Sequence, residues 1–190
     1  MKKDIILAGV GGQGIVSIAA TIGYAAVAEN LFFKQSEVHG MSQRGGAVQS
    51  HFRLSDKEIF SDLIPLGKAD IIISVEPMEA LRYLPWLSKN GWLVTNTEPY
   101  INIPDYPSLD SIMTEFSKIQ NVIALNADKI AKELKSSKSA NMVVLGAASP
   151  YLDIKFEQLE KAIHTLFGRK GEKIVEDNIK ALRAGKDYKP

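Results

Sequence analysis

Cysteine is absent from the 190 residues of this chain. The chain therefore cannot form a disulfide, and it has no thiolate for a zinc ion, for an iron–sulfur cluster or for nucleophilic catalysis. Long apolar runs are also missing, since none approaches the ~18 residues that span a membrane. The apolar run after Lys2 and Lys3 is short and is interrupted by glycine, so it indicates a buried first strand rather than a signal peptide. We expect a soluble cytoplasmic protein.

Charge of one sign is not in excess anywhere along the chain. Lysine and arginine number 23, aspartate and glutamate 22, and the formal net charge is +1. A nucleic-acid surface would usually need a strong basic excess, so no nucleic-acid partner is expected. Hydrophobic residues make up 45% of the chain, enough for a substantial core. At this length we expect one domain, spanning 1–190.

Histidine is also scarce, with only His39, His51 and His164. No two of them have metal-ligand spacing on one predicted element, so we expect no metal site. The G-x-S-x-G pattern of serine hydrolases does not occur.

Apolar periodicity predicts strands that alternate with helices. The predicted strands are 5–9, 31–34, 47–54, 69–75, 92–95 and 122–125, with a possible hairpin return at 58–60. The predicted helices are 15–29, 76–88, 108–118, 127–135, 141–148, 156–167 and 171–184, the last ended by Gly185. This order predicts an α/β fold: a Rossmann-like, mostly parallel sheet with helices on both faces and further helices at the C-terminus.

The first strand is followed by the glycine-rich run 9–14, Gly-Val-Gly-Gly-Gln-Gly. Glycine permits a tight turn there, and the free N–H groups of the next helix can bind an anion. A dinucleotide site would also need an acidic residue at the end of the second strand, but 30–35 contain none. Three interpretations stay open: a bound NAD or flavin, a turn used only for packing, and a phosphate or acidic partner group against Gly12 to Gly14.

The second polar run, 36–46, is Ser-Glu-Val-His-Gly-Met-Ser-Gln-Arg-Gly-Gly. It combines a carboxylate, an imidazole, an amide and a guanidinium with three glycines that let backbone groups approach a ligand. A purely structural loop, with Arg44 paired to Glu37, would also explain it. Both runs follow predicted strands, so we expect them at the carboxyl edge of the sheet, where ligands bind in such folds.

Four stretches in this order resemble the gamma-domain family of 2-oxoacid:ferredoxin oxidoreductases. They are 9–14, 36–46, the run Ser-Val-Glu-Pro-Met-Glu-Ala-Leu at 74–81, and Asn141-Met142 followed by Leu145-Gly146. The variant from Glu37 to Gly46 is similar to the small (beta) subunits of the indolepyruvate branch. The resemblance covers nearly the whole chain.

The resemblance implies a division of labour between two subunits. A large (alpha) catalytic subunit would hold thiamine diphosphate, magnesium and the iron–sulfur clusters, and this chain alone would bind no cofactor. The complex would oxidatively decarboxylate aryl pyruvates to aryl-acetyl-CoA, with coenzyme A as co-substrate, and would pass the electrons to ferredoxin.

The same resemblance suggests which residues face the large subunit or a ligand. They are Gly11, Gly12, Gln13, Gly14, Ser36, Glu37, His39, Gly40, Ser42, Gln43, Arg44, Gly45 and Gly46. Arg44 and Gln43 would bind an anionic group of coenzyme A or of the partner, and Glu37 would orient Arg44 or His39. No residue is assigned to the chemical step. Two other functions remain: a stand-alone NAD(P)- or flavin-binding reductase, and an assembly module that touches no ligand.

Overall fold

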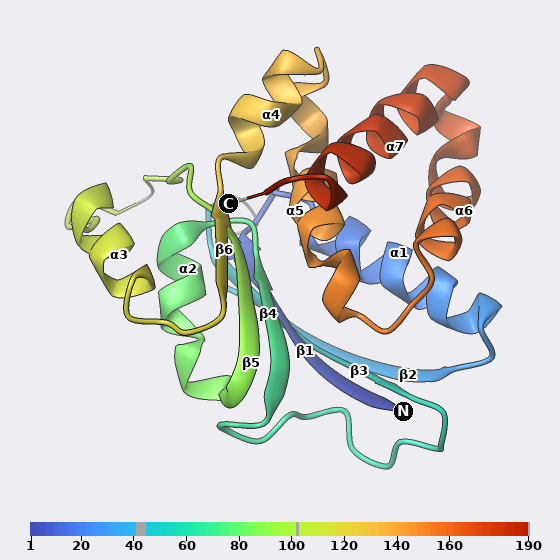
Figure 1. Cartoon of the computed structure of the whole chain (residues 1–190), viewed down its shortest axis with the longest axis horizontal. Helices are drawn as coiled ribbons and strands as arrows, with labels where there is room; N and C mark the ends of the chain where they lie inside the picture. The colour runs from blue at the N-terminus through green and yellow to red at the C-terminus, as the bar shows by residue number, and fades with distance from the viewer. Residues whose placement is uncertain (41–44, 102, 190) are drawn as a thin grey trace.

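The computed structural model describes residues 1–40, 45–101 and 103–189, and its centre is a six-stranded sheet in the order β2-β3-β1-β4-β5-β6 (Figure 1). The strands are β1 (Lys2–Val10), β2 (Phe32–His39), β3 (Ala47–Ser55), β4 (Ala69–Ser74), β5 (Leu87–Asn96) and β6 (Val122–Leu125).

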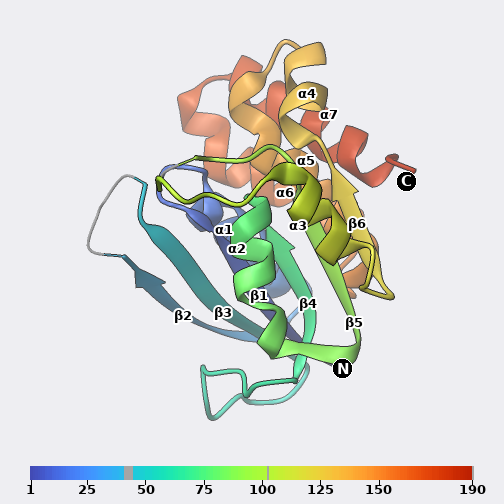
Figure 2. The ribbon, with the colours of Figure 1, turned by 90° about the vertical axis from the view of Figure 1, so that its left-hand side faces the viewer.

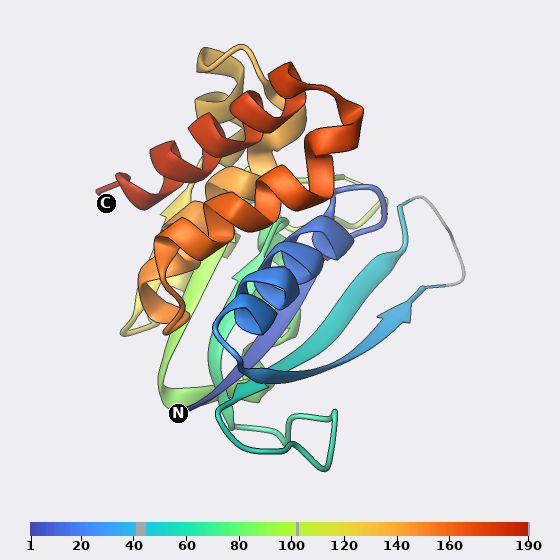
Figure 3. The ribbon, with the colours of Figure 1, turned by 90° about the vertical axis from the view of Figure 1, so that its right-hand side faces the viewer.

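The strand directions confirm a mostly parallel sheet. β1, β4, β5 and β6 are parallel neighbours, whereas β3 is antiparallel to both β1 and β2. β2 therefore runs in the same direction as β1, with β3 inserted between them. Figure 3 shows α1 (Ile15–Ala28) in front of β1, with β3 and β2 to its side. The unit from β1 through α1 to β2 is thus a crossover split by one antiparallel strand.

Helices cover both faces of the sheet, as predicted (Figures 1 and 2). The helices after α1 are α2 (Pro77–Arg82), α3 (Leu109–Phe116), α4 (Ala127–Glu133), α5 (Ala140–Ala148), α6 (Phe156–Phe167) and α7 (Glu172–Lys186). Short 3₁₀ turns lie at Leu84–Trp86, Ser137–Ser139, Ser149–Tyr151 and Gly168–Lys170. α2 and α3 lie on one face, and α1, α5, α6 and α7 lie on the other.

The core follows from the alternation of side chains along buried strands. Ile5 and Leu7 of β1 join the cluster under α1, α5, α6 and α7, whereas Ile6 and Ala8 join the cluster under α2 and α3. A strand buried on both faces needs apolar residues at every position, which is why the start of the chain has an uninterrupted apolar run.

The segment 56–68, between β3 and β4, is held by Arg53, which also forms an ion pair with the buried Asp4. Arg53 donates from Nε to Asp4 Oδ1 (2.7 Å) and from Nη2 to Oδ2 (3.2 Å). Its remaining nitrogen, Nη1, donates to the carbonyl oxygens of Ser61 (2.9 Å) and Leu63 (3.1 Å). The predicted hairpin return at 58–60 is therefore wrong: side-chain bonds from Arg53 hold this segment, and residues 58–60 form no strand.

The predicted helix from 76 to 88 is also too long. α2 ends at Arg82, a 3₁₀ turn follows, and β5 begins at Leu87. Asn90 and Gly91, which lie between the predicted helix and the predicted strand 92–95, are inside β5. A Cβ atom on Gly91 would lie 2.9 Å from the carbonyl oxygen of Ala69, so glycine is needed where β5 passes close to β4.

Gly185 does not end the last helix, because α7 continues to Lys186. A Cβ on Gly185 would lie 1.9 Å from the carbonyl oxygen of Val143 in α5, and one on Gly146 would lie 2.0 Å from that of Leu182 in α7. The two glycines let α5 and α7 touch backbone to backbone. Within the described residues, no helix is both long enough and apolar enough to cross a lipid bilayer.

Candidate functional site

The two glycine-rich runs meet at the carboxyl edge of the sheet. The backbone N–H of Gly11 donates to the carbonyl oxygen of Gly46 (2.8 Å), and that of Gly45 donates to the carbonyl oxygen of Gly11 (3.5 Å). The first run follows β1, and Gly45 and Gly46 directly precede β3. The structure thus brings together two segments that are more than 30 residues apart, as their expected position at strand ends predicted.

The first run, 9–14, is a tight turn in which the glycines and the glutamine have different structural roles. A Cβ on Gly9 would lie 2.4 Å from Val75 Cγ2, so glycine permits close packing on the end of β4. Gln13 accepts the N–H of Val10 through Oε1 (2.8 Å) and closes the turn. Gly12 has a φ of +100°, and a Cβ there would meet nothing within 4 Å. Gly12 is therefore kept for its backbone conformation and faces open space.

Gly14 connects the first run to α5. It has a left-handed conformation (φ +84°) at the start of α1, and a Cβ there would lie 2.5 Å from Asn141 Nδ2. Asn141 Nδ2 donates to the carbonyl oxygen of Gly14 (3.1 Å). The stretch that begins at Asn141 thus lies directly on the glycine turn.

The second run is less loop-like than its composition suggested. Ser36 to His39 belong to β2, which pairs with β3 in a register that sets Glu37 opposite Ser50 and His39 opposite Val48. The prediction that the strand ends at 34 is wrong, because β2 is an edge strand whose polar half is held by the ladder to β3 rather than by burial. Ser42, Gln43 and Arg44, with Met41, lie outside the described residues, so their roles stay predictions.

Glu37 is paired with His39 in the structure. Glu37 Oε1 lies 2.5 Å from His39 Nε2, and Gln35 Nε2 donates to Glu37 Oε2 (3.1 Å). The His39 side chain is 57% exposed, whereas that of Glu37 is 15% exposed. The half-buried carboxylate therefore orients the exposed imidazole, which is one of the two arrangements that the sequence suggested for Glu37.

Glu76 is the residue whose importance the sequence understated. It is fully buried at the end of β4 and caps α2 by accepting the N–H of Glu79 at Oε2 (2.8 Å). Its other oxygen accepts the N–H of Tyr100 (3.2 Å) and the hydroxyl of Tyr106. Burial, followed by this hydrogen bond, raises the pKa of Tyr106, so its hydroxyl stays protonated and donates. Glu76 thus anchors the described residues 97–101 and 103–108, which lie between β5 and α3.

The anchored segment reaches the second glycine run. A Cβ on Gly45 would lie 3.9 Å from Tyr100 Cε1, so the ring of Tyr100 lies beside Gly45. Figure 2 shows this segment running from the end of β5 toward the start of β3. Described residues from all four stretches that carry the family resemblance, among them Gly11, Gly46, Glu76 and Asn141, therefore lie at one end of the sheet.

A hollow beside the first run completes the site, and the sequence interpretation missed its second wall. Two adjoining cavities, of about 460 and 420 Å³, share Gly12, Gln13, Ser137, Lys138 and Asn141 as lining residues. The missed wall is the turn Lys-Ser-Ser-Lys-Ser at 135–139, between α4 and α5. Its signal in the sequence was a short cluster of lysine and serine between two helical patterns.

His51, on the predicted strand 47–54, has a structural role. His51 Nδ1 accepts the N–H of Ile64 (2.9 Å), and burial lowers the pKa of His51. No group of three His, Asp or Glu side chains in the described part of the chain is arranged to hold a metal ion.

Comparison with known proteins identifies the family. The model of the pyruvate ferredoxin/flavodoxin oxidoreductase family matches residues 4–188, so the chain belongs to this family. One relative, the indolepyruvate oxidoreductase subunit IorB of Archaeoglobus fulgidus, is 39% identical over 97% of this chain and 94% of its own length. This similarity confirms the resemblance found in the sequence.

Solved structures agree with the fold. The gamma subunit of a keto/oxoacid ferredoxin oxidoreductase from Geobacter sulfurreducens is 26% identical, with a TM-score of 0.70 over 96% of this chain and 95% of that one. The 2-oxoglutarate:ferredoxin oxidoreductase of Magnetococcus marinus, solved with 2-oxoglutarate, coenzyme A and succinyl-CoA bound, shares the fold at 24% identity and a TM-score of 0.76. The match covers 97% of this chain but only 30% of that longer one.

Proposed function

We propose that this chain is the small subunit of an indolepyruvate (aryl-2-oxoacid):ferredoxin oxidoreductase of the cytoplasm. With a large subunit, it would convert aryl pyruvates to aryl-acetyl-CoA and reduce ferredoxin. The observation that carries the proposal is that described residues from all four family stretches lie at one end of the sheet. The high coverage of a relative named as an indolepyruvate oxidoreductase subunit supports the choice of substrate.

The end of the sheet that carries both glycine runs is proposed to face the large subunit. Large apolar side chains are exposed around it: Val38 (59%), Tyr100 (44%) and Ile101 (72%). Exposed apolar groups beside polar ones are typical of surfaces that another chain covers. The contact would be made by Gly11 to Gly14 and by Ser36 to Gly46.

The redox cofactors are proposed to lie on the large subunit. Iron–sulfur clusters are held by cysteine thiolates, and this chain has none. Thiamine diphosphate and magnesium would lie there as well and would supply the decarboxylation chemistry. This chain would shape the wall of the cavity, and Arg44 and Gln43 would bind an anionic group of coenzyme A or of the partner.

Reconstitution tests the proposal. The chain is co-purified with a large subunit that contains thiamine diphosphate and clusters, and the complex is assayed with indolepyruvate, coenzyme A and a ferredoxin. We expect turnover only with both chains, and faster turnover of indolepyruvate than of pyruvate or 2-oxoglutarate. Full activity of the large chain alone would refute the requirement for this subunit.

Arg44→Ala separates a ligand-binding role from a pure assembly role, with the exposed Arg169→Ala as the matched control. An intact complex with a raised KM for coenzyme A supports ligand contact. Loss of the complex with the Arg44 variant alone supports the assembly module.

A stand-alone NAD(P)- or flavin-binding reductase is less favoured by the fold. In a dinucleotide site the acidic residue stands on the strand next to β1. Here β3 separates β1 from β2, and the β2 carboxylate of Glu37 is paired with His39. Titration of the purified chain with NAD(H), NADP(H) and flavin tests this alternative, and no binding at millimolar concentrations would end it.

A further inference from the structure

The outer side of α1 lacks the charged residues that surface helices usually carry. None of its 14 residues, Ile15–Ala28, is a lysine, arginine, aspartate or glutamate. Yet Val16, Tyr24 and Val27 are 58%, 51% and 60% exposed. A helix that is mainly apolar all round is normally buried all round, but the described residues cover only one side of α1. The exposed side is therefore suited to contact with another molecule.

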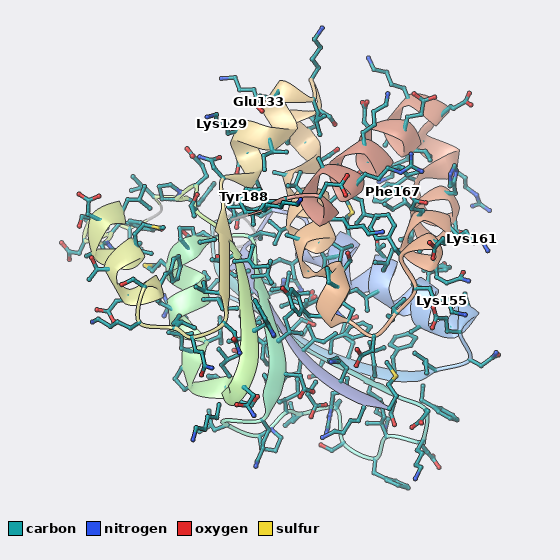
Figure 4. All side chains as sticks on the ribbon, viewed as in Figure 1. Lys129, Glu133, Lys155, Lys161, Phe167 and Tyr188 are labelled. Atoms are coloured by element: carbon teal, nitrogen blue, oxygen red, sulfur yellow. The ribbon has the colours of Figure 1, made fainter. Side chains whose placement is uncertain are left out.

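Other helices carry charge on their outer sides, and the comparison narrows the kind of partner. Lys129 and Glu133 of α4 and Lys161 of α6 are exposed (Figure 4). A helix that lies on a lipid surface likewise has lysines or arginines beside its apolar side, and α1 has none. At 14 residues, α1 is also shorter than a membrane-spanning helix. The exposed side of α1 therefore fits a protein surface.

A groove separates α1 from β2, the outermost strand of the sheet. Tyr24 and Val27 of α1 line one side of a cavity of about 300 Å³, and Phe33 and Gln35 of β2 line the other. Among the described residues, β2 pairs only with β3, and in Figures 2 and 3 no described helix or strand lies beyond it. The outer N–H and C=O groups of β2 can therefore pair with a strand of another chain.

The exposed aromatic rings at this edge can supply a large part of a stable interface. Tyr24, Phe32 and Phe33 are 51%, 52% and 40% exposed. Covering three such rings would remove roughly 300 Å² of the chain's surface from water. A standard interface removes about 800 Å² from each partner, so the rings alone would supply about a third of it. The exposed valines of α1 and the backbone edge of β2 would add to this area.

The apolar residues of β2 fit a second copy of the same strand. Phe33 stacks on Phe52, which belongs to the core beneath α1, so Phe32 and Val38 point to the opposite face of the sheet. In an antiparallel pair of β2 strands centred on Gln35, each Phe32 would stand opposite Val38 of the other copy. Both side chains are more than half exposed in the single chain, at 52% and 59%. The pairing would cover them on both copies.

The charges of β2 agree with the same register. Lys34 of one copy would stand opposite Ser36 of the other, and Phe33 would stand opposite Glu37. No two charged residues would be directly opposed, and like charges in that position would destabilise a strand pair. The strand is therefore complementary to itself in both its apolar and its charged positions.

We propose that two copies of this chain form a dimer by pairing their β2 strands into one continuous sheet. The twofold axis would pass beside Gln35, so that the same surface of each copy makes the contact. The two α1 helices would lie on the same face of the joined sheet, and their exposed apolar sides would close the two grooves. Antiparallel pairing would set the glycine runs of the two copies at opposite ends of the joined sheet. This inference concerns the isolated chain and does not depend on the large subunit.

The mass of the full chain in solution tests the proposal. Light scattering on the purified chain at micromolar concentrations should give twice the 20.9 kDa of one chain. A mass of 20.9 kDa at about 100 μM would overturn the proposal, because a dimer that weak could not persist by itself.

Val27→Glu tests the groove, with Leu66→Glu on the segment 56–68 as the matched control. The two positions are 60% and 63% exposed, and only Val27 lines the groove. We expect Val27→Glu to raise the dissociation constant of the dimer about a hundredfold or more, because each dimer would bury two unpaired carboxylates. The control should leave it nearly unchanged, and circular dichroism checks that both variants fold. Equal dissociation constants for the two variants would overturn the proposal.

Amide hydrogen exchange locates the contact on the strand. In the dimer, Phe32–His39 should exchange slowly throughout, whereas the outward N–H groups of β2 should exchange faster in the Val27→Glu variant. A dimer whose β2 amides exchange as fast as those of the variant has another interface and would refute the pairing. Protection of β2 that arises only when a large subunit is added would refute it as well, because that subunit would then cover the edge.

Discussion

Replacing Gly185 by alanine should destabilise the protein, although alanine is the better helix former. The added Cβ would lie 1.9 Å from the carbonyl oxygen of Val143, where a carbon and an oxygen normally stay about 3.3–3.6 Å apart. A backbone carbonyl inside α5 cannot rotate away as a side chain can. α5 and α7 would therefore have to separate, and α5 carries the Asn141 that bonds to Gly14.

The size of the effect follows from two opposing contributions. Overpacking of a tight core contact costs about 1–3 kcal/mol, and the rigid backbone here places it near 3 kcal/mol. Alanine returns about 1 kcal/mol through its helix propensity. The net loss of free energy of unfolding is then about 2 kcal/mol, which for a chain of this size lowers Tm by roughly 4–8 °C.

The matched control is Gly168→Ala. Gly168 has a helical conformation (φ −54°), and a Cβ there would meet nothing within 4 Å. We expect this variant to be unchanged or up to about 1 kcal/mol more stable. Urea unfolding followed by circular dichroism compares both variants with the wild type. A Gly185 variant as stable as the Gly168 variant would mean that the two helices do not touch through their backbones.

Three further contacts on which the fold and the site depend, those of Arg53, Glu76 and His51, can be tested by substitution. Arg53→Met should lower the free energy of unfolding by about 2–3 kcal/mol, because it removes two hydrogen bonds to the buried Asp4 carboxylate and leaves only Lys2 (2.8 Å) beside it. Adding Asp4→Asn should restore part of this loss in urea unfolding, and strictly additive losses would contradict the pairing. Glu76→Gln should lower the free energy of unfolding by about 1–3 kcal/mol, because its amide NH₂ would face a hydrogen-bond donor. Tyr106→Phe should lower it less. A Gln variant as stable as the wild type would contradict the role of Glu76 in anchoring the segment between β5 and α3. Because burial lowers the pKa of His51 below its ordinary 6.5, the unfolded chain binds a proton first, so the free energy of unfolding should fall as the pH drops through about 6.5. His51→Asn should flatten that part of the profile, and an unchanged slope would rule out this histidine as the cause.

The sequence predicted the elements whose signals are local. α6 runs from Phe156 to Phe167 as its apolar spacing indicated, and Asn126 caps α4 by accepting the N–H of Lys129 (2.8 Å). The errors arose where tertiary contacts decide. Gly91 and Gly185 resembled helix ends, but their neighbours in space are the backbones of β4 and α5. Nothing in the flanking residues distinguishes a glycine that ends a helix from one that admits another helix.

The site was predicted in part for the same reason. Strand ends placed both glycine runs at one edge, and their contact through Gly11 and Gly46 agrees with that expectation. The register that draws Ser36 to His39 into β2 depends on β3, and the edge strand has no apolar alternation to reveal it. The place of the turn Lys135 to Ser139 beside the glycine turn depends on how α4 and α5 pack, which no spacing in the sequence records.

The bond between Gly11 and Gly46 has a consequence for how this protein can diversify. Both atoms of this hydrogen bond belong to the main chain. The contact between the two turns therefore does not depend on ionic strength, on protonation or on the side chains around it. Relatives can exchange the residues that point outward from the two turns and so change what they recognise, while the frame beneath keeps its shape.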